Sequence, residues 1–308
     1  MTATAYDSLP ELGDLGVRRS WGIWGEHDRL GTLNRVTDGT TLRALATPST
    51  GRRVNLSLPL DFIHPPLYGR SPLRHRVFDR NRNMVEDEVG PLDPQSSSQW
   101  DSLRHIRAKQ HGHYGGLAAD DPAVPGLGVG AMAGHGLVVR GVLVDLPGHW
   151  AATGREVDPF DDHPVGPDVL AEALSRQGVT IVDGDLLLVR TGWLTRYRRT
   201  GVAADRRAMP PSAGLSAAES TARFLWDSGF CAVAADNPAV ENLPGDPVVG
   251  SLHRRLIPGL GMPMGELWDL DELAAACRAL GRWTVCVATV PLNLPGGVAS
   301  PANAVAIL

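Results

Sequence analysis

The most regular feature of the chain is a set of short apolar runs that alternate with segments of helical periodicity. Runs that are apolar at nearly every position and rich in β-branched residues are typical of strands buried on both faces of a sheet. Such runs occupy residues 137–146, 184–192, 230–236 and 284–290. Helical patterns occupy residues 168–177, 216–228 and 269–279. The alternation predicts an α/β domain with a central sheet that helices cover on at least one face.

Two of these helices carry sequence signals for their first turn. Ser216 is followed three residues later by Glu219, which predicts a capping box at the start of the helix over residues 216–228. Asp269 is the expected cap of the helix over residues 269–279.

The pattern in the first third of the chain is weaker. Thr37 or Asp38 would cap a short helix over residues 38–46, and alternating polarity over residues 54–60 predicts a strand. Residues 61–94 are rich in Pro, Arg and Asp and show almost no periodicity. A loop of that length in a compact domain is usually functional, so we predict a lid or an oligomer arm.

No internal repeat, low-complexity tract or linker divides the 308 residues. We therefore predict a single domain over residues 1–308, in which residues 1–20 form a flexible or interface arm. The hydrophobic share of 43% is enough for a sizeable core.

Charge and cysteine content narrow the class of protein. The net charge of -5, with no basic patch, argues against nucleic acid or an anionic membrane as the main partner. No apolar stretch reaches about 18 residues, so we expect neither membrane spanning nor export. The three cysteines, Cys231, Cys277 and Cys286, lie in apolar contexts and predict no disulfide framework, which fits a reduced, cytoplasmic location.

Two polar clusters carry the candidate chemistry. The segment Gln95–His105 combines three adjacent serines, two glutamines, Asp101 and a histidine. Each such group would cost about 1–3 kcal/mol if it were buried unpaired, so the segment is either solvated or part of a site. The second cluster, His253–Glu266, places a histidine and a carboxylate in Gly- and Pro-rich sequence. We predict that the two clusters meet, with an acid/base or metal-assisted site between them.

Common alternatives lack their motifs. The glycine cluster at residues 126–130 does not stand between a strand and a helix, so it predicts no dinucleotide site, and no phosphate-binding loop, CxxC pair or G-x-S-x-G elbow is present.

Each candidate also has a purely structural interpretation. Asp101 could cap a helix that starts near Ser102, and His105 four residues later could form an ordinary helical pair with it. His253, next to two arginines, could lie on a solvated helix face. Trp100 could stack on an aromatic substrate or belong to the core or an interface.

The clusters resemble a known signature. His-x-Gly-Thr-His-x-Asp-x-Pro-x-His aligns without gaps on Gln95–His105, and a later His and Glu of that family fall on His253 and Glu266. The chain thus resembles the metal-dependent cyclase superfamily, which includes bacterial kynurenine formamidases and isatin hydrolases. Its SSQWDSLRH segment resembles a branch that reads SSQWDGLRH. Further matching segments lie at residues 31–34, 140–145, 190–193, 236–241, 259–266 and 291–303, so the resemblance covers residues 20–308.

The resemblance implies a swivelling β/β/α fold with a central mixed sheet and flanking helices, in homodimers or homotetramers. It implies that Asp101, His253 and Glu266 are metal ligands and that His105 is the general acid/base. It also places His111 and His113 near the pocket. Asn34 and Arg190 are candidate anchors for a substrate carbonyl or carboxylate.

The sequence departs from the signature at both leading histidines, which are Gln95 and Gln99 here. An amide oxygen is a poorer zinc ligand than imidazole, which argues against a dinuclear zinc site. Asp101, His253, Glu266 and Gln99 would suit one Mn²⁺ or Zn²⁺ ion. A metal-free pocket that uses the same residues, with Gln95 and Gln99 binding substrate, is the open alternative.

The expected activity is hydrolysis of a C–N amide or lactam bond, or of a lactone, in a small cyclic or aromatic substrate. Two other functions stay open on the sequence. One is a non-hydrolytic cyclase or lyase of secondary metabolism, and the other is a binding protein without catalytic activity.

Overall fold

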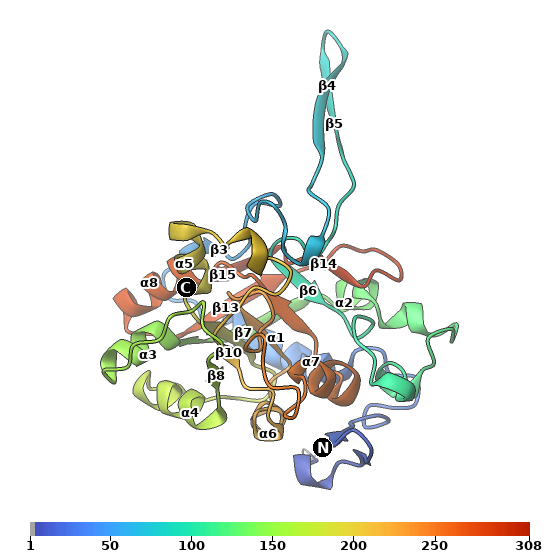
Figure 1. The fold of residues 1–308 in the computed structure, drawn as a ribbon, viewed down its shortest axis with the longest axis vertical. Helices are drawn as coiled ribbons and strands as arrows, with labels where there is room; N and C mark the ends of the chain where they lie inside the picture. Colours follow the sequence, from blue (N-terminus) through green and yellow to red (C-terminus); the bar gives the residue numbers. More distant parts are fainter. Residues whose placement is uncertain (1–3) are drawn as a thin grey trace.

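A curled sheet of nine strands runs through the protein, which is described over residues 4–308 by a computed structural model (Figure 1). In spatial order its strands are β14 (Ala299–Pro301), β6 (Gln99–Asp101), β12 (Met264–Glu266), β11 (Ala232–Ala235), β9 (Leu186–Arg190), β7 (Leu137–Asp145), β13 (Thr284–Thr289), β15 (Ala304–Ile307) and β3 (Arg53–Asn55). The four central strands from β12 to β7 are parallel, and the outer pairs are antiparallel. The predicted α/β fold with a central mixed sheet is confirmed.

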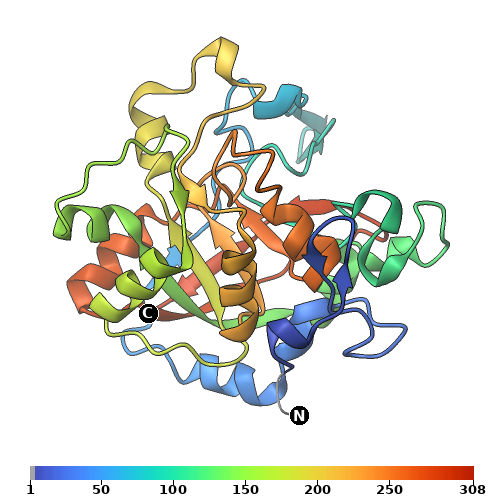
Figure 2. The ribbon, with the colours of Figure 1, turned by 60° about the horizontal axis from the view of Figure 1, so that its bottom comes forward.

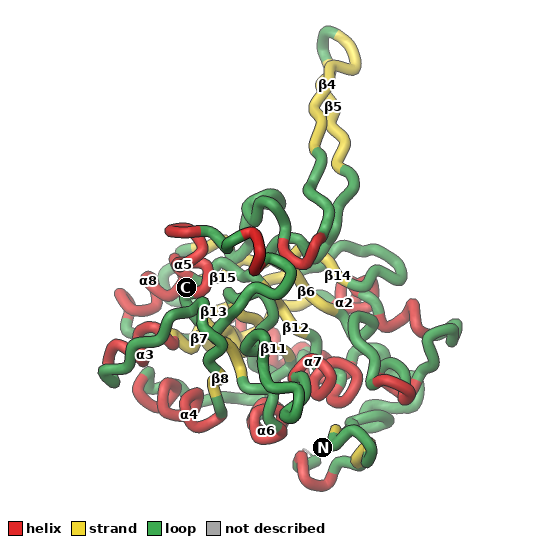
Figure 3. The backbone as a smooth tube through the Cα atoms, in the orientation of Figure 1, coloured by secondary structure: helices red, strands yellow, loops and turns green. Residues whose placement is uncertain are grey.

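Helices surround this sheet, as Figures 1 and 3 show. They are α1 (Asp38–Leu45), α2 (Val129–His135), α3 (Leu146–Ala152), α4 (Pro167–Arg176), α5 (Trp193–Thr200), α6 (Glu219–Asp227), α7 (Leu252–Arg254), the π-helical turn η8 (Arg255–Leu260) and α8 (Asp271–Leu280). Short 3-10 turns are η1 (Tyr6–Ser8), η2 (Gly31–Arg35), η3 (Leu67–Gly69), η4 (Lys109–His111), η5 (Tyr114–Gly116), η6 (Val124–Leu127) and η7 (Ala204–Arg206). Within residues 4–308, no helix is long and apolar enough to cross a membrane.

The central strands are uniformly apolar because both of their faces are covered. Successive side chains of a strand point to opposite faces. On β7, Val142 and Val144 belong to a core cluster with α3, α4 and α6, whereas Leu143 belongs to a second cluster with α8. Leu187 and Leu188 on β9 divide between the same two clusters. The sheet therefore separates two cores, which explains why the sequence runs show no alternation.

The helix over residues 38–46 is confirmed as α1, with Thr37 as its N-cap and Thr40 N–H donating to the Thr37 side chain. The strand predicted over residues 54–60 is shorter in the structure than the sequence pattern suggests. Only Arg53–Asn55 form β3, and further along the Leu58 N–H donates to the Ser98 hydroxyl rather than to a neighbouring strand.

Both predicted caps of the later helices are wrong. Helix α6 begins at Glu219 rather than at residue 216, and the Ser216 hydroxyl accepts a hydrogen bond from Ala218 N–H ahead of the helix. Asp269 lies before α8, and its carboxylate pairs with Arg198 instead of capping. In each case a nearby partner outside the helix satisfies the polar side chain.

The segment over residues 61–94 contains a hairpin that the sequence pattern does not reveal. Strands β4 (His75–Asn81) and β5 (Met84–Val89) project far from the body of the protein (Figure 1). Ion pairs join them across the strands, among them Arg76 with Glu88. Polar and charged residues at most positions of the two strands hide the period of two on which strand prediction depends. A role as lid or oligomer arm stays a prediction.

Two smaller ladders complete the fold: β1 (Glu11–Leu12) with β2 (Val17–Arg18), and β8 (Pro164–Val165) with β10 (Gly214–Leu215). The N-terminal segment packs against the body near α6 (Figure 2). Tyr6 and Leu9 are buried, and Tyr6 N–H donates to Asp227 at 2.8 Å. The expected interface role of residues 1–20 stays a prediction, and residues 1–3 lie outside the described part.

Gly265 on β12 lies where no side chain fits. A Cβ atom there would lie 2.7 Å from both Ala234 Cβ and Trp268 Nε1. We expect Gly265→Ala to lower the free energy of unfolding by about 1–3 kcal/mol, because the surrounding core must shift. Urea unfolding measures the change. In the matched control Gly134→Ala, within α2 and with open space around it, the change should be neutral or favourable by up to about 1 kcal/mol. Equal losses in both variants would contradict the packing argument.

Candidate functional site

Two three-residue strands place the polar residues of the site. β6 and β12 are antiparallel, with Gln99 opposite Glu266 and Asp101 opposite Met264. Opposed side chains of an antiparallel pair lie on one face, as do residues two apart on a strand. Gln99, Asp101 and Glu266 therefore share one face of the sheet, and all three are buried.

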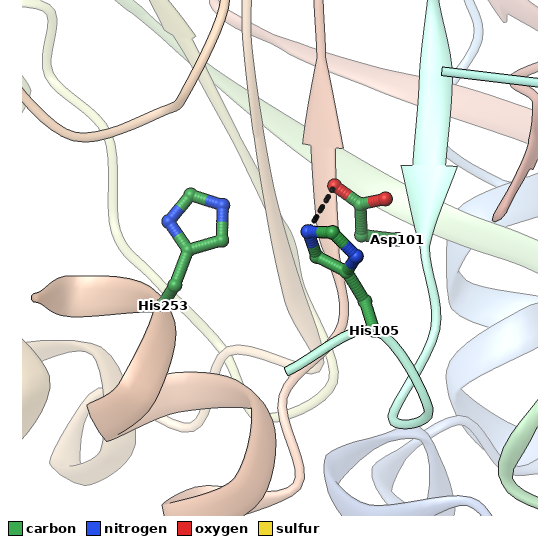
Figure 4. Close-up of side chains that lie close together, drawn as sticks. All are labelled: Asp101, His105 and His253. Atoms are coloured by element: carbon green, nitrogen blue, oxygen red, sulfur yellow. Dashed lines mark ion pairs between the residues drawn. The ribbon is translucent and has the colours of Figure 1, made fainter. Parts of the chain in front are cut away.

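Two histidines approach these carboxylates from other elements. After Asp101 the chain turns, with His105 N–H donating to Ser102 C=O, and brings the His105 ring back toward the strand. His105 Nε2 lies 4.0 Å from Asp101 Oδ2. His253 comes from α7, and its ring centroid is 6.1 Å from that of His105. Figure 4 shows Asp101, His105 and His253 pointing into one space.

Glutamine amides bridge the two carboxylates. Gln95 Nε2 donates to Asp101 Oδ1 at 2.6 Å. Gln99 Nε2 donates to Glu266 Oε2 at 2.6 Å and lies 3.3 Å from Asp101 Oδ2. These N–H groups stabilise two buried negative charges that would otherwise repel. Within residues 4–308 the Gln99 Oε1 atom is buried without a hydrogen-bond partner.

His253 lies between two carboxylates. Its Nδ1 is 2.5 Å from Glu241 Oε1, and its Nε2 is 3.1 Å from Glu266 Oε1. Burial alone would lower the pKa of His253, but the hydrogen bonds to Glu241 and Glu266 raise it well above its usual value. Burial would raise the pKa of Glu241, yet the same His253 contact lowers it. The two carboxylates therefore favour the protonated form of the ring.

His105 and Glu266 are shifted differently. Burial lowers the pKa of His105, while the charge of Asp101 acts in the opposite direction. Burial and then the charge of Asp101 raise the pKa of Glu266 to about 7. A neutral imidazole and a carboxyl group that titrates near neutrality are suited to moving protons.

These groups line one cavity of about 270 Å³. Its lining residues are Tyr68, Arg70, His105, Ile106, Pro238, Ala239, Glu241, Leu243, Ser251, His253 and Glu266. The lining combines charged and polar side chains with apolar ones such as Ile106, Pro238 and Leu243, which suits a small molecule that has both a polar and an apolar part. The Arg70 guanidinium lies over the Tyr68 ring, 4.8 Å from its centroid, and donates to the Gln95 carbonyl.

The predicted meeting of the two polar clusters is found in the structure. Asp101 and His105 lie together with His253 and Glu266, although more than 140 residues separate the two pairs in the sequence. Their structural alternatives do not hold. Asp101 ends a strand rather than capping a helix, His105 follows in a turn, and the His253 side chain is only 13% exposed.

Trp100 is not a substrate platform, contrary to the first of its two interpretations. Its side chain is fully buried on the opposite face of β6, in the core. Its Nε1 donates to the Thr289 hydroxyl at 2.9 Å, and its ring packs edge-on against Trp268 at 5.0 Å. The pleat of the strand decides this, because Trp100 lies between Gln99 and Asp101, which share the opposite face with Glu266.

Asn34 and Arg190 also lie away from the cavity. The Asn34 amide donates to Asp28 Oδ1 at 2.7 Å and holds a local turn. Arg190, at the end of β9, forms ion pairs with Asp145 and Asp271, both at 2.8 Å. Their polar groups serve the fold, so neither anchors a substrate here.

The two histidines placed by resemblance are not among the lining residues either. His111 Nε2 pairs with Asp14 Oδ1 at 2.6 Å near the surface. His113 is buried, and burial lowers its pKa, followed by the charges of Arg107 and Arg104. The expectation that His111 and His113 line the pocket is therefore wrong.

Three residues of the site escaped the sequence analysis as functional candidates: Glu241, Tyr68 and Arg70. Glu241 ends the segment 236–241, which directly follows the buried parallel strand β11, and such positions often carry function. That signal was present. Tyr68 and Arg70 come from the aperiodic segment, where no pattern marks them.

The donor atoms fit one divalent ion. One ligand atom each from Asp101, His105 and His253 lies within 4.8 Å of the others. Glu241 holds His253 through Nδ1, which directs Nε2 into the site, as carboxylates do for metal-binding histidines. The amide nitrogens of Gln95 and Gln99 donate to Asp101, so these two atoms offer no lone pairs to a metal ion.

A family comparison agrees with this geometry. The Cyclase family model, described as "Putative cyclase", matches residues 54–242, more than half of the chain. The chain belongs to the cyclase family. A comparison with curated proteins gave no match.

Solved structures resemble this cyclase-family protein over most of its length. One described as a novel cyclase is 28% identical, with a TM-score of 0.80, and the match covers 94% of this chain and 99% of that one. Isatin hydrolase A from Labrenzia aggregata, bound to benzyl benzoate, is 19% identical with a TM-score of 0.60, covering 83% and 93%. A potential metal-dependent hydrolase with cyclase activity is 17% identical with a TM-score of 0.50, covering 83% and 98%. The last two likenesses show a shared fold.

The ion pair between Glu241 and His253 should make the free energy of unfolding depend on pH, which we consider for protein freed of metal ions by EDTA. The pKa of His253 is raised in the folded state, so its pairing contributes fully below the unfolded value near 6.5 and is lost as pH rises through the folded-state pKa. We expect Glu241→Gln to lower the free energy of unfolding by about 1.5–3 kcal/mol at pH 6.

Urea unfolding at a series of pH values measures this difference. The loss caused by Glu241→Gln should shrink as pH rises, because the wild-type ring then releases its proton. The exposed Glu26 provides the control Glu26→Gln, which should have little effect at any pH. A loss that does not change with pH would show that His253 is not charged in the folded protein.

Proposed function

We propose that this cyclase-family protein is a hydrolase that opens a C–N amide or lactam bond, or a lactone, in a small cyclic or aromatic substrate. The observation that carries the proposal is a neutral His105 that lies beside Asp101 and lines a cavity of about 270 Å³. The fold shared with isatin hydrolase A is consistent with it. The apolar residues of the lining suit the body of such a substrate.

His105 is the proposed general acid/base. Since burial lowers its pKa, the ring is neutral and can accept a proton from water as the carbonyl is attacked. The same ring can then return the proton to the departing nitrogen or oxygen. The Asp101 carboxylate, 4.0 Å away, stabilises the protonated ring between these two events.

Arg70 is the proposed anchor for substrate polarity. Its guanidinium lies at the cavity lining, where it can donate to a carbonyl or carboxylate of the substrate. Ile106, Pro238 and Leu243 exclude water from the apolar part of the lining. Together they hold the scissile group toward the histidines.

Asp101, His253 and Glu266 are the proposed ligands of one divalent ion, with Glu266, which lies 3.1 Å from His253 Nε2, in place of the His105 of the three-residue donor group. The Gln99 Oε1 atom, buried without a hydrogen-bond partner among residues 4–308, is the fourth candidate. Carboxylates and an imidazole suit Mn²⁺ or Zn²⁺. When bound, such an ion polarises the carbonyl and acidifies water. This assignment leaves His105 free for proton transfer. Assembly into dimers or tetramers and a cytoplasmic location stay predictions.

His105→Ala tests the proposed proton transfer. We expect kcat on a panel of N-formyl aromatic amines, lactams and lactones to fall about 10²- to 10⁴-fold, with KM and metal content little changed. The exposed His27 offers the control His27→Ala, which should keep full activity.

Other outcomes would contradict the proposal in distinct ways. Metal lost together with turnover in His105→Ala would make His105 a ligand. Ring closure of a linear precursor without hydrolysis would favour a true cyclase or lyase. Ligand binding without any turnover in the wild-type protein would favour a binding protein.

Gln99 makes a prediction about metal binding that does not depend on activity. Imidazole is a better zinc ligand than an amide, so Gln99→His should strengthen Zn²⁺ binding about tenfold or more in calorimetric titrations. Glu266→Gln should weaken it, because a carboxylate is lost, and His27→Ala should leave it unchanged. Zn²⁺ affinity that is indifferent to both site variants would place the ion elsewhere.

A further inference from the structure

A second cavity, of about 260 Å³, lies between α3, α4 and α8. Its lining residues are Asp145, Gly148, His149, Ala152, Ala173, Arg176, Gln177, Arg278 and Trp283. None of them lines the cavity of the candidate active site. The second cavity is therefore a separate feature, and the proposed hydrolysis does not use it.

An unpaired buried imidazole marks this cavity. His149 is 5% exposed, and within residues 4–308 neither of its ring nitrogens has a hydrogen-bond partner. The nearest carboxylate oxygen, Glu172 Oε2, is 3.8 Å from Nε2, which is beyond hydrogen-bond distance. A buried polar group without a partner is unfavourable, and a ligand in the cavity would satisfy it.

The remaining hydrogen-bonding capacity of the lining consists mainly of donors. Arg278 uses one nitrogen on Asp145 at 2.6 Å, and Arg176 pairs with Glu172 at 3.4 Å. A guanidinium has five N–H groups, so both retain free donors. The acceptors are occupied, because the two oxygens of Asp145 accept from Arg278 and Arg190.

The polar groups that line the second cavity suit an anionic group, and its apolar walls suit the apolar part of the same ligand. Arg190 and Arg278 share the carboxylates of Asp145 and Asp271, and Arg176 pairs with Glu172, so the charges around the cavity balance and the unused N–H groups are what favour an anion. Trp283, Ala152 and Ala173 supply an apolar surface next to these charges.

We propose that this second cavity binds a small organic carboxylate with an aromatic or apolar body. The carboxylate lies on Arg278, Arg176 and His149, and the body packs against Trp283. This binding is independent of the proposed hydrolysis. Its chemistry differs from that of a free phosphate site because the apolar wall contributes to affinity.

Calorimetric titration of the full-length protein with benzoate, and separately with inorganic phosphate, tests the proposal. Arg278→Gln removes a donor, and Ala152→Trp fills the cavity from an exposed position on α3. Each should weaken benzoate binding about tenfold or more. Arg53→Gln, at an exposed arginine of β3, is the matched control and should leave binding unchanged.

A further variant separates this binding from the active site. Leu243→Trp obstructs the first cavity and should leave the benzoate isotherm of the second intact. Benzoate binding that Leu243→Trp abolishes and Ala152→Trp spares would overturn the proposal. Phosphate binding without benzoate binding would also overturn it, since the apolar wall would then contribute nothing.

Discussion

The candidate site depends on holding two carboxylates side by side in a buried place. Asp101 and Glu266 are 0% and 4% exposed, on adjacent strands of one sheet. Their mutual repulsion in such surroundings is large unless donors or cations compensate it. The Gln99 amide bridges them, and His253 supplies a positive charge beside Glu266. The rest of the site is arranged around this balance.

Glu241 is a third carboxylate of the site, and it holds His253 in place. It accepts from His253 and from the backbone N–H of Leu252, so the start of α7 and the ring are fixed by one carboxylate. This orientation directs Nε2 of His253 toward the cavity, where either a proton or a metal ion can lie. A carboxylate on the other ring nitrogen is the usual way in which the orientation of a metal-binding histidine is held.

Gln95 and Gln99 replace two histidines of the family signature and change the hydrogen bonding around Asp101. Imidazole nitrogens at the two leading positions would offer lone pairs to a metal, whereas the amides of Gln95 and Gln99 donate N–H groups to Asp101. A donor in place of an acceptor compensates part of the negative charge that a second ion would otherwise balance. The site therefore differs from the two-imidazole signature at two positions where the signature would offer metal ligands.

The sequence by itself determined four strands of the central sheet and the two polar clusters, but not the other strands or the full membership of the site. Strands β7, β9, β11 and β13 were predictable because burial on both faces requires apolar residues throughout. The meeting of the two polar clusters was predictable because buried polar side chains need hydrogen-bond partners. β6 and β12 were not, since three residues are too few to show a period, and only the pleat decides that Trp100 faces the core. Glu241 and Arg70 line the cavity, whereas Arg190, which the sequence suggested, pairs with Asp145 elsewhere. These contacts join distant segments, so no local pattern in the sequence predicts them.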